Sequence, residues 1–239
     1  MKYINTFTEE FRITNNMLSN KDYLKPSSIL DISQQVAGDH ADKLKIGYHD
    51  FIKKDLIWIV VRNRVEIINN KYDLKKVNAT TFAYNTRLVE YPREVLIKSN
   101  KEEIAKVKQI WMVYNLKTKS LESFDFTPYV TDRPSMFVNR IKKLPSINKD
   151  ELTFLKDVKV PLSYCDHNGH LNNSHYLDFY YDEYWANQQV NIKAFQIEYI
   201  SQAYLNETIS LYIKEEDNKH KLFGYRGEDR IFVLEVEYN

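Results

Sequence analysis

Residues 26–47 read PSSILDISQQVAGDHADKLKIG, and their apolar side chains recur at steps of three and four. This spacing predicts a helix of about five turns with one buried face. The helix is expected to begin at Pro26, with Ser28 and Asp31 at the spacing of a capping box, and to end at Gly47. The residues of the expected buried face are Ile29, Ile32, Val36, His40 and Leu44.

A long strand is predicted immediately after this helix, because apolar residues alternate along LIWIVVRNRVEI, residues 56–67. The expected buried face is interrupted only by Asn63. Its apolar members are Ile57, Ile59, Val61, Val65 and Ile67. Further strands are expected at residues 80–88, 94–99 and 104–114, with a turn at residues 115–118. One long helix followed by a meander of strands predicts an α+β fold in which an antiparallel sheet wraps its helix.

The second half of the chain repeats this order. A strand is expected at residues 156–162 and a helix from Asn173 to about Gln189. Four strands should follow, at residues 192–200, 208–215, 221–226 and 231–238. The repeated order predicts a tandem duplication, with domains at residues 1–125 and 151–239. The connector, residues 126–150, contains Pro128, Pro134 and Pro145.

Bulk composition excludes several classes of protein. Hydrophobic residues make up 43% of the 239 residues and charged residues 28%, which is typical of a globular protein. A net charge of +1 indicates no global attraction to nucleic acid. The single cysteine, the absence of a signal peptide and the lack of a membrane-spanning apolar run favour the cytoplasm. No cofactor is expected, because we find no phosphate-binding glycine loop and no cysteine-based metal motif.

The chemistry of the chain is concentrated in residues 164–173, YCDHNGHLNN. If this stretch is extended, the side chains of Asp166, Asn168 and His170 emerge on one face. Such a face could orient a water, a base and a polarised carbonyl together. The alternative interpretation is an Asx-rich turn that leads into a helix N-cap. Metal binding by the nearby histidines is disfavoured, because no helical pair of histidines is present.

Residues 166–176 resemble the Asp-x-Asn-x-His-Val-Asn-Asn-x-x-Tyr block of the plant and bacterial acyl-acyl carrier protein thioesterases. Residues 37–41 and 55–60 resemble that family's first helix end and following strand, and Trp111 with residues 116–119 resembles a further hairpin. The resemblance implies a tandem double hot-dog fold whose first helix and strand line an acyl tunnel. It also implies hydrolysis of a fatty acyl thioester of the acyl carrier protein to a free acid and a thiol. Related acyl-CoA thioesterases share the block, so a coenzyme A ester remains an alternative substrate.

The same resemblance places Asp166, Asn168 and His170 on the family's active-site positions. Aligning Glu198-Tyr199 with the family's Glu-Tyr puts Gln202 at a position where the family has a glutamate, and Ala203 where plant members have a cysteine. Glutamine cannot act as a general base and alanine cannot attack a carbonyl. A non-hydrolytic acyl-binding protein is therefore a second alternative, and a homodimer of the whole chain is left open.

The hypothesis is direct attack by water on the thioester carbonyl. His170 or Asp166 would accept the proton, and Asn168 would fix the water or the carbonyl. Gln202 would position the water. Backbone N–H groups near Asn173, at the expected helix start, would stabilise the oxyanion with help from the helix dipole.

Other conspicuous side chains have simpler interpretations. Cys165 has the wrong strand parity to pair with His170 and is expected to be a small hydrophobic residue. His40 is expected in the core or at a pocket wall. An aromatic stripe is expected to pack in the core; it consists of Tyr176, Phe179, Tyr180 and Tyr184. A basic cluster in the connector could receive an acidic carrier protein, with a solvated surface as the alternative; it consists of Arg140, Lys142 and Lys143.

Overall fold

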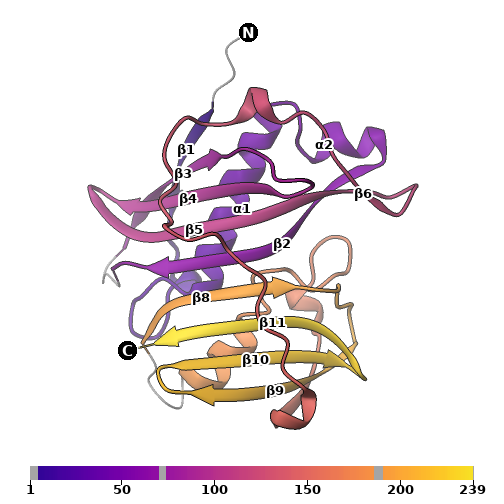
Figure 1. The fold of residues 1–239 in the computed structure, drawn as a ribbon. Coiled ribbons are helices and arrows are strands. Elements are labelled where there is room, and N and C mark those ends of the chain that lie inside the picture. Colours follow the sequence, from indigo (N-terminus) through magenta and orange to yellow (C-terminus); the bar gives the residue numbers. More distant parts are fainter. Residues whose placement is uncertain (1–4, 70–73, 186–190, 239) are drawn as a thin grey trace. The chain divides into compact units, whose positions relative to one another are not determined.

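The computed structural model describes residues 5–69, 74–185 and 191–238, and it divides into two compact units (Figure 1). The first unit is Met1–Arg140 and the second is Ile141–Asn239. The boundary falls within the predicted connector, residues 126–150. The domain limits at residues 125 and 151 stay predictions.

The first unit is a long helix, α1 (Pro26–Lys43), and an antiparallel sheet with the strand order β1-β3-β4-β5-β2. The helix contacts several strands of this sheet, β3 most extensively. A short helix, α2 (Tyr48–Phe51), follows α1, and β6 pairs with the end of β5. The strands are β1 (Thr6–Arg12), β2 (Leu56–Ile67), β3 (Lys76–Ala83), β4 (Tyr91–Ser99), β5 (Glu102–Asn115) and β6 (Ser120–Glu122).

The predicted buried face of α1 is confirmed, since all five of its residues are buried. The predicted start at Pro26 is confirmed, whereas the predicted capping box and the end at Gly47 are wrong. Lys25 is the N-cap residue and no side chain caps the helix, because Ser28 is the third residue of α1 and not its N-cap. The helix ends at Lys43, and Lys45 takes the left-handed conformation with a φ of 62°. Gly47 instead permits close packing, since a Cβ there would lie 1.7 Å from Asp42 Oδ1.

A β-bulge in β2 overturns the predicted buried face of this strand. The register with β5 shifts between Val60 and Arg62, so Val61 is the extra residue. Val60 pairs with Trp111 and Asn63 pairs with Gln109 on the inner face of the sheet. The predicted buried face is therefore correct only after the bulge, at Asn63 and Val65, which are fully buried. Before the bulge, Trp58 and Val60 face inward in place of Ile57 and Ile59.

The second unit is also built on an antiparallel sheet, with the order β8-β11-β10-β9-β7. The predicted strands are all present, with ends shifted by a few residues. They are β7 (Thr153–Lys159), β8 (Ile192–Tyr199), β9 (Thr208–Glu216), β10 (Lys219–Arg226) and β11 (Asp229–Tyr238).

The predicted helix from Asn173 to Gln189 is wrong at its start. Residues 173–177 form turns, α3 spans only Asp178–Tyr180, and a π-helical turn follows at Tyr181–Trp185. Residues 186–189 of the prediction lie outside the described residues. The aromatic stripe does pack in the core as predicted, since all four of its members are buried. Within the described ranges, no helix has the length and apolarity to span a bilayer.

Candidate functional site

Residues 165–171 form a tight turn rather than an extended strand. The Asp166 N–H donates to the His170 carbonyl at 2.8 Å, and Gly169 adopts a left-handed φ of 78°. Asp166 Oδ1 accepts the backbone N–H groups of Asn168 at 2.8 Å and His170 at 3.1 Å. The expectation that side chains alternate on one face is therefore wrong. The Asx-rich turn, the alternative interpretation, is what the structure contains.

This turn is joined to the loop that carries Gln202. The Leu171 N–H donates to the Ala203 carbonyl at 2.8 Å, and the Leu205 N–H donates to the Gly169 carbonyl at 3.2 Å. The imidazole of His170 lies edge-on to the Tyr204 ring at 4.8 Å between centroids. The structure thus brings the Asp166–His170 turn and the Gln202 loop side by side, although sequence separates them by some thirty residues.

Tyr176 holds this loop in place. Its hydroxyl accepts the N–H of Ala203 at 3.2 Å, and burial raises the pKa of Tyr176 to about 12. The phenol therefore stays protonated at neutral pH. Tyr176 was expected in the aromatic stripe and is the last residue of the family-like block, but its contact with the Gln202 loop was not predicted.

The polar side chains of the two segments differ in their availability. Among the described residues, no group hydrogen-bonds to the ring nitrogens of His170 or to the side-chain amide of Asn168. The amide oxygen of Gln202 has only a long contact, accepting from Tyr204 Oη at 3.5 Å. Asp166, in contrast, directs its carboxylate at the backbone of its own turn. His170, Asn168 and Gln202 are the groups that can reach a substrate or a water.

The residues after the turn do not form the expected oxyanion site at a helix start. Asn172 Oδ1 accepts the N–H of Ser174 at 3.2 Å, and the Asn173 carbonyl accepts from Tyr199 Oη at 2.7 Å. Because α3 begins only at Asp178, no helix dipole acts at Asn173. Cys165 is half-buried and its thiol donates to the Pro161 carbonyl at 3.4 Å.

The nearby histidines do not assemble a metal centre. His175 Nδ1 lies 2.6 Å from Asp178 Oδ2, and its ring stacks on Tyr164 at 4.3 Å. In the part of the chain that the structure describes, no group of three or more histidine, cysteine, aspartate or glutamate side chains could hold a metal ion.

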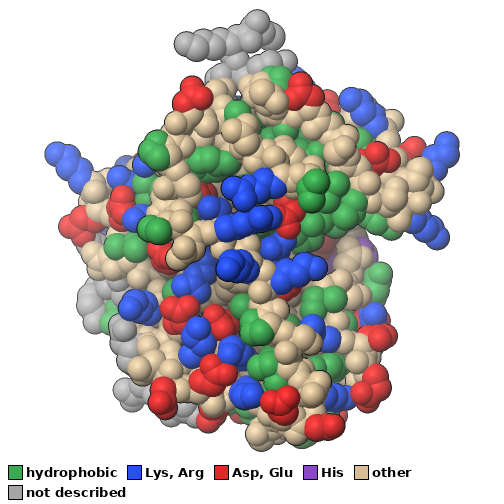
Figure 2. Space-filling model, viewed as in Figure 1, with side chains coloured by type: hydrophobic (Ala, Val, Ile, Leu, Met, Phe, Trp, Pro, Cys, Tyr) green, Lys and Arg blue, Asp and Glu red, His purple; other side chains and the backbone are tan. Residues whose placement is uncertain are grey.

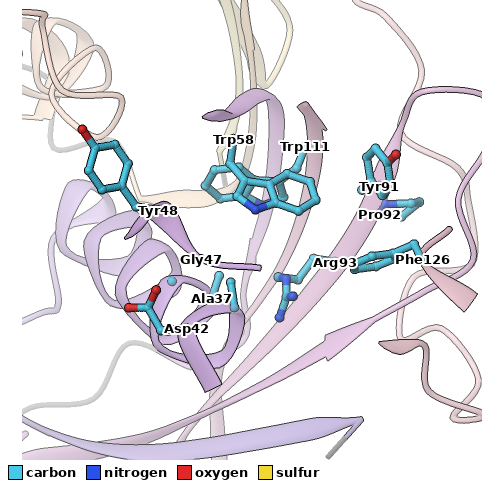
Figure 3. Close-up of a pocket in the computed structure, with 12 residues that line it drawn as sticks. Ala37, Asp42, Gly47, Tyr48, Trp58, Tyr91, Pro92, Arg93, Trp111 and Phe126 are labelled. Atoms are coloured by element: carbon cyan, nitrogen blue, oxygen red, sulfur yellow. The ribbon is translucent and has the colours of Figure 1, made fainter. Parts of the chain in front are cut away.

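A largely apolar cavity of about 220 Å³ lies in the first unit, between α1 and the sheet. Figure 3 shows Trp58 and Trp111 together on one side of this cavity, with Tyr91 and Phe126 on another. The first helix and strand, which were expected to line an acyl tunnel, contribute Ala37 and Trp58 to this cavity. Tyr91, Arg93 and Phe126 were not anticipated, and the acyl tunnel itself stays a prediction. The lining residues are Ala37, Gly38, Ala41, Asp42, Gly47, Tyr48, Trp58, Tyr91, Pro92, Arg93, Trp111 and Phe126.

His40 was expected either in the core or at a pocket wall, and the structure places it in the core beside this cavity. It is fully buried and its Nδ1 lies 2.9 Å from Arg93 Nη1. Thr81 Oγ1 accepts from the same nitrogen of Arg93 at 3.0 Å. Burial lowers the pKa of Arg93 to about 10, so the guanidinium remains charged at neutral pH.

Basic side chains occur on both units. Figure 2 shows lysine and arginine side chains over β4 and β5, with acidic side chains beside them. Several are ion-paired: Lys108 with Glu94 at 3.0 Å, and Arg140 with Glu90 at 3.2 Å. Lys142 and Lys143 are exposed. Docking of a carrier protein at the connector stays a prediction.

Comparison with known proteins places these features in a family. Residues 4–125 match the model of the acyl-ACP thioesterase N-terminal domain. The fold is similar to that of an acyl-ACP thioesterase from Bacteroides thetaiotaomicron, with a TM-score of 0.89, 17% identity and coverage of 98% of both chains. It is also similar to the 12:0-ACP thioesterase from Umbellularia californica, with a TM-score of 0.85, 16% identity and coverage of 98% of this chain and 97% of that one. No curated protein is significantly similar in sequence. The fold is thus a tandem double hot-dog.

Proposed function

This chain belongs to the acyl-acyl carrier protein thioesterase family, and we propose that it releases fatty acids from the acyl carrier protein by water attack at the turn of residues 165–171. The observation that carries the proposal is the pairing of this turn with the Gln202 loop. That pairing presents one imidazole and two amide side chains without strong partners in the described protein. The products are a free fatty acid and the carrier thiol.

His170 is the proposed general base. An imidazole takes up and returns protons near neutral pH, and the two ring nitrogens of His170 make no hydrogen bond to the described residues. It accepts a proton from the water as the water oxygen bonds to the thioester carbonyl carbon. Collapse of the tetrahedral intermediate breaks the carbon–sulfur bond, and the imidazolium returns the proton to the departing sulfur.

Asn168 and Gln202 orient the reactants rather than exchange protons. A side-chain amide offers both a donor and an acceptor, so Asn168 can hold the attacking water or donate to the carbonyl oxygen. Gln202 can hold the water from the neighbouring loop. Asp166 is a positioning residue, because its carboxylate accepts the two N–H groups that set the shape of the turn.

The cavity of the first unit is the proposed acyl site. Its wall is dominated by aromatic rings and small residues of α1, which favour the burial of a hydrocarbon chain. Trp58, Tyr91 and Phe126 also pack against one another, with Trp58 and Tyr91 at 5.2 Å between centroids. This aromatic wall would limit which acyl chains enter. We further propose that the enzyme works in the reducing cytoplasm, in keeping with its single free cysteine.

The substrate is tested by offering the purified protein matched acyl-acyl carrier protein and acyl-coenzyme A esters. We expect the larger kcat/KM with the carrier-protein ester. Faster turnover of the coenzyme A ester would overturn the assignment of the carrier. Binding of both esters without release of thiol would instead favour the non-hydrolytic alternative.

A further inference from the structure

A row of buried polar side chains crosses the inner face of the first unit's sheet. Arg93 of β4 is paired with Gln109 of β5, and Gln109 is paired with Asn63 of β2. Arg93 is 6% exposed, and the other two are fully buried. Polar groups are rarely placed at such positions unless they have partners. The row therefore needs a physical explanation.

Arg93 has no anionic partner among the described residues. Only its Nη1 is hydrogen-bonded, and both partners, His40 and Thr81, are neutral acceptors in that contact. The other buried charges nearby are matched: Glu94 is ion-paired with Lys108, and Arg62 is ion-paired with Glu90. A buried guanidinium without a carboxylate is costly, because it loses hydration without a compensating charge.

The free side of Arg93 faces the cavity. The residue belongs to the cavity lining, and its Nε and Nη2 donate to no described residue. Figure 3 shows its side chain reaching from β4 toward α1, where Ala37 lies. A plain hydrocarbon chain that filled this space would exclude water from these donors and give them nothing in return.

Gln109 supplies a second donor without an acceptor. Its Nε2 is buried and has no hydrogen-bond partner, while its Oε1 accepts from Trp111 Nε1 at 3.3 Å. Trp111 itself lines the cavity. Arg93 and Gln109, which are cross-strand partners in the sheet, thus both hold N–H donors that no described residue accepts.

We propose that the cavity selects acyl chains that carry an acceptor oxygen, as a hydroxyl or oxo substituent, where the chain passes Arg93. The oxygen would accept from Arg93, and the Gln109 amide would complete the polar end of the site by direct or water-mediated contact. This inference rests on the proposed acyl site in the first unit. It makes Arg93 and Gln109 specificity-determining residues for the acyl chain.

Binding measured without turnover tests the inference. The probes are methyl esters of one saturated fatty acid, either unsubstituted or hydroxylated at successive positions, titrated into the intact protein by calorimetry. Esterification removes the carboxylate, which could otherwise bind Arg93 in a reversed orientation. We expect at least one hydroxylated isomer to bind about tenfold or more tightly than the parent ester, which is the effect of one hydrogen bond from a charged donor. Equal affinity for all isomers and the parent would overturn the proposal.

Variants assign the preference to its residues. Arg93→Met should abolish it, and Gln109→Leu should reduce it, while the exposed Arg87→Met serves as the matched control and should retain it. Because Arg93→Met could fail to fold, Gln109→Leu keeps the test decisive, and circular dichroism checks both. An undiminished preference in folded Gln109→Leu and Arg93→Met would refute the assignment. Hydrolysis of carrier-protein esters without any preference for the oxygen would refute this inference alone. A hydroxyl preference without hydrolysis would instead refute the proposed function.

Discussion

Two replacements of Asp166, by alanine and by asparagine, distinguish whether this residue positions the turn or acts as the general base. Its Oδ1 holds two backbone N–H groups, at 2.8 Å and 3.1 Å, in a turn that is half-exposed. Each such bond stabilises the turn by about 1 kcal/mol. Asp166→Ala should therefore destabilise the ordered conformation of the turn by about 2 kcal/mol. That loss corresponds to a fall in kcat/KM of roughly thirtyfold. Asp166→Asn retains the accepting oxygen and should lose less than about fivefold.

The assay is steady-state hydrolysis of acyl-acyl carrier protein by the two variants and the unmodified enzyme. Asp157→Asn is the matched control, because Asp157 accepts from Ser210 Oγ across β7 and β9, outside the turn. If Asp166 were the base, the asparagine variant would lose the proton acceptor and fall by a factor on the order of 10² or more. Equal and large losses in Asp166→Asn and Asp166→Ala would therefore refute the positioning role.

Four further outcomes follow from the structure. His170→Ala should lower kcat by a factor on the order of 10² to 10⁴ with little change in substrate binding, and an unchanged kcat in the folded variant would exclude His170 as the base. Gln202→Glu should change kcat by less than about threefold if His170 is the base, whereas a large rise in single-turnover rate would show that a carboxylate is the missing group. Gly47→Ala should lower the free energy of unfolding by about 1–3 kcal/mol in urea titrations, because its Cβ would meet Asp42; an unchanged midpoint would contradict the close packing. Burial lowers the pKa of His220 from its ordinary 6.5. As the pH falls, the unfolded state therefore takes up this proton at a higher pH than the folded state does. The free energy of unfolding should decrease as the pH drops below 6.5. His220→Gln should flatten this dependence, and an identical slope in the variant would assign the effect to other groups.

The regular parts of the fold were predictable because their period is visible in the sequence. The apolar spacing along α1 identified its buried face, and alternation identified the strands of both units. The start of α1 at Pro26 was predictable, but its cap was not, since Ser28 has the right chemistry for a cap and lies inside the helix. The helix expected at Asn173 failed for a related reason, because the asparagine side chains stabilise local turns that compete with helix.

The candidate site was predictable in its residues and not in its geometry. The resemblance pointed to Asp166, Asn168, His170 and Gln202, but alternation could not describe a chain that turns back at Gly169. The cavity was harder to foresee, because Arg93 in a strand is ordinarily a surface residue. Only the three-dimensional register shows that it shares the inner face with Gln109.

The extra residue in β2 also offers a route to altered selectivity. Deleting Val61 would remove the residue that has no partner in β5, and the pairs Val60–Trp111 and Arg62–Ile110 would become consecutive. Trp58 would keep its place in the cavity wall, but the local bend that the bulge gives to β2 would be lost. A shortening of the gene by a single codon could thus change the curvature of the cavity wall without replacing any residue that lines it.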